Sequence, residues 1–384
     1  MYKDLSVYIH IPFCIRKCSY CDFASKTPEE GELIAYKNSL CTEIRQAYKY
    51  ADRFTVKTVF IGGGTPSIYA PGVISDILSC LRETFEKRRQ GSYNPYEITI
   101  ECNPGTISEH KLISYKEAGV NRLSIGLQSA DDGELKLLGR IHTYSEWEES
   151  MRLARKCGFS NINTDIISGI PYQNVDSFKE TLKKVVFYNP EHISVYSLII
   201  EEGTPFYEMF GTDKINDDEL DLWEERDRRI YEFTNGYLSS YGYDRYEISN
   251  YAKTGYECAH NLVYWRRGDY LGFGLSAASM IDNERFSVTD SLGEYLNPDI
   301  VNIKNRQALD KNGQMSEYMF LGLRKTKGID VNDFKEKFGC DIYDVYDKQI
   351  KDNIAAGLLV KNGDYLYLSQ RGIDISNTVM SDFI

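Results

Sequence analysis

Three cysteines stand close together near the start of the chain, in the pattern Cys14-x3-Cys18-x2-Cys21. The other six of the nine cysteines have no framework spacing, so in a reducing compartment the three indicate metal binding rather than disulfides. Full protein ligation of a [4Fe–4S] cube needs a thiolate on each iron. Three closely spaced thiolates therefore predict a cube with one iron free for an exchangeable ligand.

Structural zinc is an alternative use for the same cysteines. Zinc in a structural site prefers four closed ligands, and the obvious fourth ligand here is His10. His10 lies within a predicted strand rather than on the cysteine loop. The cluster is therefore the favoured interpretation, and a zinc-stabilised interaction protein is the remote alternative.

Glycine and polar residues follow the predicted strands repeatedly further along the chain. They are the loop Gly62-Gly63-Gly64-Thr65 after the second strand, Glu101 at the end of the third, Gln128 at the end of the fourth and Asp165 near the end of the fifth. Glycines let backbone amides approach a ligand without interference from a Cβ atom. Carboxylates can accept hydrogen bonds from ribose hydroxyls and can offset a positive charge. Because these residues follow consecutive strands, they predict one shared site.

The elements that must position these residues alternate between strand and helix up to about residue 200. Strands are predicted over 5–11, 58–61, 97–101, 122–127, 161–167 and 193–200. Helical spacing separates them, and Ser108 and the Thr143-x-x-Glu146 capping box are expected to open two of the helices. This alternation predicts an α/β fold, a partial (β/α)6 barrel resembling a TIM barrel. Its functional groups would gather at the carboxyl ends of parallel strands.

The rest of the chain changes character after the barrel. A polar helix is expected over 217–238, then a segment rich in tyrosine and glycine to residue 278, and a linker near Asn297-Pro298. From about residue 314, helical patterns lead to a hairpin around Gly363-Asp364, as in winged-helix folds. We therefore predict a barrel domain over 1–240, an extension over 241–300 and a smaller, mainly helical C-terminal domain over 301–384.

The composition argues against several classes of function. The 384 residues include 45 basic and 57 acidic side chains, a net charge of −12, and the densest basic run, Lys87-Arg88-Arg89, ends a predicted helix. A nucleic-acid partner is therefore not expected. No run approaches the roughly 18 apolar residues of a membrane span, and the first residues lack the apolar core of a secretory signal. We expect a cytoplasmic protein, with peripheral membrane contact left open.

The residues around the cysteines match a known family pattern. The stretch Tyr8-Ile-His-Ile-Pro-Phe-Cys14-Ile-Arg-Lys-Cys18-Ser-Tyr-Cys21 resembles the opening of the radical SAM superfamily, in the subgroup that contains HemN and HemW. The resemblance implies that S-adenosylmethionine (SAM) fills the open iron with its amino and carboxylate groups, and that an electron donor reduces the cluster. It also places Tyr20 against the adenine of SAM and Tyr8 at the edge of the cluster.

The same resemblance extends to the residues that follow the later strands. Gly62-Gly63-Gly64-Thr65-Pro66 is similar to the methionine-binding turn of the superfamily, which implies that Gly63, Gly64 and Thr65 contact SAM. Glu101, Gln128, Arg140 and Asp165 fall on SAM-contacting positions of the subgroup. The motifs that hold three of them are Thr99-Ile-Glu-Cys-Asn-Pro, Ser124-Ile-Gly-Leu-Gln-Ser and Asn163-Thr-Asp-Ile-Ile-Ser-Gly-Ile-Pro.

Two features distinguish the chain from one branch of that subgroup and join it to the other. HemN proteins carry a fourth cysteine where this chain has Phe23, and no counterpart of their N-terminal extension is expected here. HemW proteins share a His-Asn-x-x-Tyr-Trp run, present as His260-Asn261-Leu262-Val263-Tyr264-Trp265. The resemblance implies a chaperone that binds haem as cargo and delivers it to haem-requiring respiratory proteins. His260 is its tentative haem ligand, with Cys258 as a second candidate.

An enzyme is the main alternative to the chaperone. It would be an oxygen-independent coproporphyrinogen III dehydrogenase like HemN, or a radical SAM enzyme that acts on another tetrapyrrole. The departures at Phe23 and at the N-terminus disfavour the dehydrogenase. No residue is assigned a catalytic role.

Overall fold

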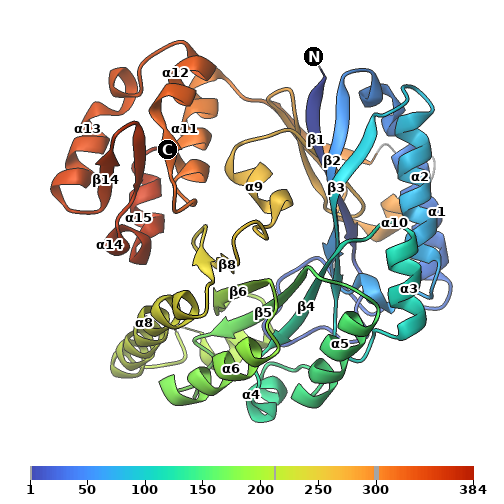
Figure 1. The fold of residues 1–384 in the computed structure, drawn as a ribbon, viewed down its shortest axis with the longest axis horizontal. Coiled ribbons are helices and arrows are strands. Elements are labelled where there is room, and N and C mark those ends of the chain that lie inside the picture. Colours follow the sequence, from blue (N-terminus) through green and yellow to red (C-terminus); the bar gives the residue numbers. More distant parts are fainter. Residues whose placement is uncertain (1, 212, 298–301) are drawn as a thin grey trace.

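The computed structural model describes residues 2–211, 213–297 and 302–384. Its larger part is built on one twelve-stranded sheet, and a smaller C-terminal unit carries a three-stranded sheet of its own. Figure 1 shows the large sheet as a curved wall with helices against one side and the C-terminal unit on the other. The strand order of the large sheet is β12-β11-β10-β9-β1-β2-β3-β4-β5-β6-β8-β7.

Six parallel strands form the centre of the large sheet. They are β1 (Lys3–Ile11), β2 (Phe54–Gly63), β3 (Tyr93–Cys102), β4 (Arg122–Gln128), β5 (Ile162–Ser168) and β6 (His192–Ser197). The helical connections are α1 (Glu32–Gln46), η1 (Ala47–Asp52), η2 (Pro66–Ile68), α2 (Val73–Glu86), α3 (Glu109–Glu117), α4 (Asp132–Leu137), α5 (Tyr144–Lys156) and α6 (Val175–Phe187). Each strand pairs in parallel with the next. The predicted partial (β/α)6 barrel is therefore confirmed.

The barrel stays open because both of its edge strands pair onward. β1 pairs with β9 (Tyr270–Phe273), and β6 pairs with β8 (Asn250–Ala252). The other elements of this part are α7 (Pro205–Phe210), α8 (Asp217–Ser240), β7 (Asp244–Arg245), α9 (Ala259–Trp265), β10 (Ala278–Ile281), β11 (Glu284–Val288), α10 (Leu292–Tyr295) and β12 (Ile303–Ala308). The polar helix predicted over 217–238 is confirmed as α8. The strands between residues 241 and 281 were not predicted individually, because two to four residues are too few to show a period.

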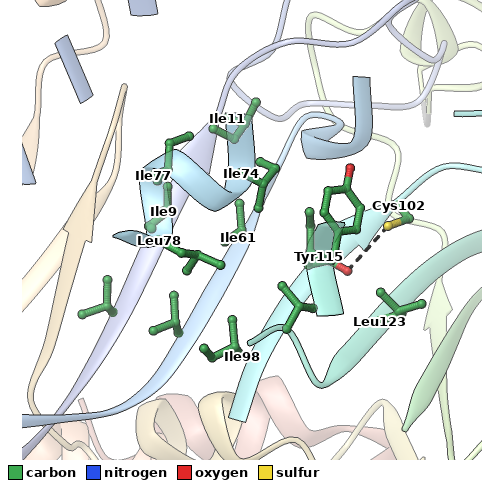
Figure 2. Packing of buried hydrophobic residues seen from close by; sticks show 14 of the residues in the cluster. Ile9, Ile11, Ile61, Ile74, Ile77, Leu78, Ile98, Cys102, Tyr115 and Leu123 are labelled. Atoms are coloured by element: carbon green, nitrogen blue, oxygen red, sulfur yellow. Dashed lines mark hydrogen bonds between the residues drawn. The ribbon is translucent and has the colours of Figure 1, made fainter. Parts of the chain in front are cut away.

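The two faces of the central strands differ in chemistry because side chains alternate along a strand. Ile9 and Ile11 of β1 are completely buried, and Figure 2 shows them in one cluster with Ile77 of α2. Full burial of such a side chain contributes about 1.5–3 kcal/mol relative to exposure. Tyr8 and His10 point to the other face, where Tyr8 Oη lies 3.0 Å from His10 Nδ1. The strand predicted over 5–11 is confirmed, and β1 begins two residues earlier.

Local sequence determines where two of the helices begin. The Ser108 side chain accepts a hydrogen bond from the Lys111 N–H at the start of α3. Thr143 and Glu146 form the predicted capping box at the start of α5, in which each side chain bonds the backbone of the other residue. Both predicted caps are confirmed, and they satisfy N–H groups that the helix itself leaves free.

The C-terminal unit has a separate hydrophobic core, which begins at Met315 and ends at Phe383. Its elements are α11 (Lys311–Gly322), β13 (Ile329–Asp330), α12 (Val331–Phe338), α13 (Ile342–Ala355), β14 (Leu359–Asn362), β15 (Tyr365–Leu368), α14 (Gln370–Asp374) and α15 (Ser376–Ser381). The predicted hairpin at Gly363-Asp364 is confirmed, since β14 and β15 pair in antiparallel fashion on either side of it. In the predicted linker, Pro298 lies outside the described residues. The limits 1–240, 241–300 and 301–384 stay a prediction.

A buried ion pair joins the C-terminal unit to the large sheet. Arg267, just after α9, donates from Nε to a carboxylate oxygen of Glu317 in α11 at 2.8 Å, and both side chains are almost fully buried. Arg285 of β11 approaches the other oxygen of the same carboxylate at 2.9 Å. The N–H of Thr326 also donates to the carbonyl of Tyr246 at 3.1 Å. Polar contacts of defined geometry therefore hold the two units together.

Among the described residues, no helix combines the length and the apolar character needed to cross a membrane.

We predict that Glu317→Ala lowers the free energy of unfolding by about 3–5 kcal/mol, because it leaves Arg267 buried without its carboxylate. Urea denaturation followed by circular dichroism measures the change. Glu117→Ala, at an exposed position at the end of α3, is the control and is expected to shift the free energy by less than about 0.5 kcal/mol. Equal effects of the two substitutions would contradict the proposed contribution of the ion pair.

Candidate functional site

A cavity of about 370 Å³ opens at the carboxyl ends of the central strands. Most of the residues predicted for the cluster or for SAM line it. They are Cys14, Cys18, Tyr20, Cys21, Gly63, Gly64, Thr65, Glu101, Gln128, Arg140 and Asp165. The structure brings these eleven residues together from the ends of five strands, and it places Tyr8 and His260 elsewhere.

The loop that carries the three cysteines follows β1 and is tied to its surroundings through the backbone. The N–H of Cys14 donates to the carbonyl of Lys26 at 2.9 Å. The N–H of Ser19 donates to the carbonyl of Leu138, just after α4, at 3.1 Å. These bonds fix both ends of the cysteine loop over the mouth of the barrel.

Polar groups of neighbouring loops reach the cysteine sulfurs. Thr65 Oγ1 donates to Cys14 Sγ at 3.4 Å, and Arg140 Nη1 donates to Cys18 Sγ at 3.6 Å. Such donors favour the thiolate, which is the form that binds metal, whereas burial raises the pKa of the Cys21 thiol. Within the described residues, no three His, Cys, Asp or Glu side chains lie close enough to share one metal ion. A cube takes each thiolate on a different iron, so its ligands need not converge on one point as the ligands of zinc do.

The glycine turn after β2 passes very close to the end of β1. Gly63 has a φ of 108°, and a Cβ atom there would lie 2.4 Å from the ring of His10. A Cβ atom at Gly64 would lie 2.6 Å from the carbonyl oxygen of Phe13. Only glycine fits these two positions. The turn therefore packs directly against the start of the cysteine loop.

The N–H groups of this turn are used within the protein. Gly63 N–H donates to Glu101 Oε2 at 2.9 Å, and Gly64 N–H donates to the carbonyl of Ile11 at 2.8 Å. These two amides therefore have acceptors within the protein, because a turn pressed against β1 and β3 finds them there. Gly63 and Gly64 nevertheless line the cavity, and their contact with SAM stays a prediction.

Two carboxyl groups face the cavity from β3 and β5. Burial, and then repulsion by Asp165, raise the pKa of Glu101 to about 8, although the N–H of Gly63 partly offsets the rise. Asp165 accepts hydrogen bonds from Ser124 Oγ at 2.9 Å and from Asn163 Nδ2 at 2.7 Å. Two carboxyl groups this close to each other form a site that favours a cationic ligand.

Arg140 and Asn103 connect the strand ends to the cysteine loop. Arg140 Nη2 donates to Asn103 Oδ1 at 2.8 Å and to the carbonyl of Gly126 at 3.0 Å. Asn103 Nδ2 in turn donates to Thr65 Oγ1 at 2.8 Å. Asn103 was not predicted, although it lies two residues after Glu101 and directly follows β3.

Other walls of the cavity come from the ends of β4 and β6. Gln128 ends β4 with a φ of 73°, which is uncommon for a residue with a side chain and is found most often at functional sites. Tyr196 and Ile199, at and beyond the end of β6, also line the cavity. They were not predicted, but the rule that located Glu101 and Gln128 applies to the sixth strand as well.

Tyr8 lies beneath the cavity rather than in its wall. Its ring packs 6.3 Å from that of Phe60, and its hydroxyl bonds His10. Burial, and then the charge of Glu101, raise the pKa of Tyr8 well above its ordinary value. Tyr8 is therefore placed to support the cavity floor from inside the barrel.

His260 lies inside the barrel at the end opposite the cysteine loop. Its Nδ1 lies 2.9 Å from Thr58 Oγ1, and its Nε2 lies 2.9 Å from the hydroxyl of Tyr264. Burial, and then the charge of Arg122, lower the pKa of His260 to about 3. Both ring nitrogens have partners in the protein, so coordination of haem iron would require His260 to give up at least one of them.

The start of α9 explains why His260 is held in this way. The carboxylate of Glu97 on β3 accepts hydrogen bonds from the N–H groups of Ala259 and His260, each at 2.9 Å. The thiol of Cys258 also donates to Glu97, at 3.6 Å. The favourable position of a carboxylate at a helix N-terminus anchors α9 within the barrel. These contacts hold His260 and Cys258 in place within the barrel, and their assignment as haem ligands stays a prediction.

The open parallel barrel and the three cysteines at its mouth are the features of a radical SAM protein. Residues 8–185 match the family model of the radical SAM superfamily, and residues 309–375 match that of the HemN C-terminal domain. The solved structure of coproporphyrinogen III oxidase (HemN) from Escherichia coli has a TM-score of 0.83 to this chain at 24% identity, and the match covers 100% of this chain and 90% of that one. At this identity the likeness shows a shared fold alone.

Relatives of higher identity define the family. The chain is 33% identical to the heme chaperone HemW of Bacillus subtilis, over 99% of both chains. It is 34% identical to the heme chaperone HemW of Escherichia coli, over 99% of this chain and 98% of that one. The chain belongs to the HemW family, within the radical SAM superfamily.

We predict that the carboxyl pair makes the stability of the cluster-free, SAM-free protein fall as the pH rises. Because the pKa of Glu101 rises from 4.5 to about 8 on folding, its contribution to stability is present in full below the lower value and is lost as the pH rises through the higher one. Glu101→Gln removes this titration. The urea midpoint of the wild type, relative to that of Glu101→Gln, is expected to fall between about pH 5 and about pH 9. A difference that is the same at both pH values would contradict the assignment, and Glu117→Gln is the exposed control.

Proposed function

We propose that Cys14, Cys18 and Cys21 hold a [4Fe–4S] cluster and that SAM binds beside it in the same cavity. The three thiols lie on one anchored loop, and hydrogen-bond donors reach two of the sulfurs. Membership of the superfamily supports the same assignment. When bound and reduced by its electron donor, the cluster would supply an electron to the sulfonium centre of SAM.

The side chains around the cavity have distinct tasks in this proposal. Glu101 and Asp165 can accept hydrogen bonds from ribose hydroxyls and balance a positive sulfonium charge. Arg140 holds Cys18 and Asn103 in a fixed relation, and Tyr20 offers a ring from the cysteine loop to the adenine. Gly63, Gly64, Thr65 and Gln128 complete the wall that would surround SAM. Tyr8 would act from below the cavity, by positioning His10 under the glycine turn.

We propose further that the protein is a haem chaperone, which binds haem as cargo and delivers it to haem-requiring proteins of the respiratory chain. The observation that carries the proposal is the match to heme chaperones over nearly the whole length of the chain. The position of the fourth HemN cysteine supports it, since Phe23 stands there and is 66% exposed. The proposal includes an electron donor for the cluster and a cytoplasmic location, with peripheral membrane contact left open.

We predict that Cys14→Ala removes the iron. After anaerobic reconstitution, the wild type is expected to hold about four irons per chain and to absorb broadly at about 400 nm. The variant is expected to hold almost no iron. Cys157→Ala is the matched control, because Cys157 caps the end of α5 away from the cavity. Unchanged iron content in Cys14→Ala would overturn the cluster assignment.

We predict that the reconstituted wild type binds haem saturably, with a defined stoichiometry, and does not decarboxylate coproporphyrinogen III. The first is measured by absorbance titration, and the second by analysis of the porphyrin products after incubation with SAM and a reductant. Decarboxylation at a rate above that of Cys14→Ala would show an enzyme of the HemN type. Absence of haem binding would rule out the chaperone.

A further inference from the structure

A second cavity, of about 890 Å³, lies between α9 and the C-terminal unit. Trp265 and Arg266 at the end of α9 line one side of it, and Tyr318 of α11 and Lys337 of α12 line another. Figure 1 shows α9 between the large sheet and the C-terminal unit. Ligand cavities commonly measure about 300–1,000 Å³, so this one has room for a large planar molecule.

The two faces of α9 have different surroundings. His260 and Tyr264, four residues apart, share the face that points into the barrel, where they bond each other and Thr58. Leu262 and Arg266, also four residues apart, share the face that lines the second cavity. The His-Asn-x-x-Tyr-Trp run therefore anchors the helix with one face and builds a cavity wall with the other.

Basic side chains in this wall lack a carboxylate partner. Lys325 is half-buried, and burial, with the charges of Arg266 and Lys327 as further causes, lowers its pKa to about 8. In the part of the chain that the structure describes, no carboxylate lies within ion-pair distance of Lys325, Arg266 or Lys337. The charges of Lys325 and Arg266 repel each other, and an anionic ligand would relieve that repulsion.

Acidic side chains in the same wall limit which anion fits. Glu257, Asp330, Asp333 and Glu336 also line the cavity, and the charge of Asp333 raises the pKa of Lys325. A polyanion such as a nucleoside triphosphate would meet these carboxylates at close range. A ligand with two separate carboxylates on an apolar body can contact the cations and avoid the acids.

Aromatic rings supply a surface for that apolar body. Trp265 of α9, Tyr318 of α11 and Tyr365 of β15 line the cavity. The cavity-lining Lys337 and Lys327 lie over the rings of Tyr318 and Tyr365, at 5.5 and 4.8 Å from the ring centres, whereas the cation over Trp265 is Arg324, which does not line the cavity. Trp265 is therefore the ring on which the apolar body can lie. Flat aromatic side chains favour contact with a flat conjugated ring. Haem combines such a ring with two propionate carboxylates on one edge.

We propose that this second cavity binds the haem cargo, with Trp265 against the macrocycle and with Lys325, Arg266 and Lys337 paired with the propionates. The inference rests on the proposed chaperone function and names the site at which that function is exercised. The haem then lies at the far end of the barrel from the cysteines, and His260 supports its wall without contacting it.

A haem titration of charge variants tests the site. Lys325→Gln and Lys337→Gln are expected to raise the Kd of haem about tenfold and several-fold, since each removes a charge-assisted contact to a propionate. Lys335→Gln is the matched control, because Lys335 lies on the same helix as Lys337 but does not line the cavity. Its Kd is expected to stay within about twofold of the wild type, as is usual for an exposed charge.

Haem dimethyl ester, which lacks the free carboxylates, completes the experiment. The wild type is expected to bind the ester more weakly than haem, and Lys325→Gln is expected to show a much smaller difference between the two. Equal losses for haem and ester, or equal affinities in Lys325→Gln, Lys337→Gln and the control, would overturn the assignment. Displacement of haem by SAM from the reconstituted protein would also overturn it, because it would place haem in the cysteine cavity. If the wild type binds no haem, the proposed chaperone function itself is contradicted.

Discussion

The close approach of the glycine turn to the ends of β1 and β3 is the constraint on which the cysteine cavity depends. A Cβ atom at Gly62 would lie 2.7 Å from Glu101 Oε2, and one at Gly63 would lie 2.4 Å from the His10 ring. With no side chain in the way, the turn bonds Glu101 through its backbone and brings Thr65 to the sulfur of Cys14. A bulkier residue would separate the carboxyl pair from the cysteine loop. The positions of Glu101 and Thr65 relative to the cysteine loop follow from this contact.

The opposite end of the barrel depends on a second buried contact. The interior faces of these strands carry polar side chains, and buried polar groups need partners. Glu97 obtains its partners from the first turn of α9, and Thr58 obtains one from His260. The polar side chains inside this end of the barrel therefore find partners in α9 as well as in the strands. The helix that closes this end, α9, carries the His-Asn-x-x-Tyr-Trp run.

The sequence was sufficient to predict the parts of the fold that depend on local pattern. The hydrophobic pattern over residues 5–11 predicted the strand β1, and Thr143 with Glu146 predicted the start of α5. The rule on strand ends also predicted that Glu101 and Asp165 would share a cavity. The contacts that could not be predicted are those between segments that lie far apart in the chain.

The hydrogen bonds of the glycine amides and the burial of His260 are of that second kind. No periodicity indicates that Gly64 N–H meets Ile11, or that His260 meets Thr58, about 200 residues away in the chain. Asn103 was not predicted for the same reason, because its role is to join Arg140 to Thr65 through two hydrogen bonds. A motif identifies residues that belong together, but the partner of each side chain is decided by the tertiary packing.

The two cavities are separated by packed side chains. Thr58 and Gly62 lie on the same inner face of β2, four residues apart, which corresponds to about 13 Å along a strand. Between these levels the ring of Phe60 packs 6.3 Å from Tyr8 on one side and 5.3 Å from His260 on the other. Rings in such contact fill the space between the two levels of the barrel, because protein interiors are close-packed. Tyr8, Phe60 and His260 therefore form a continuous packed route between the floor of the cysteine cavity and the helix that lines the second cavity.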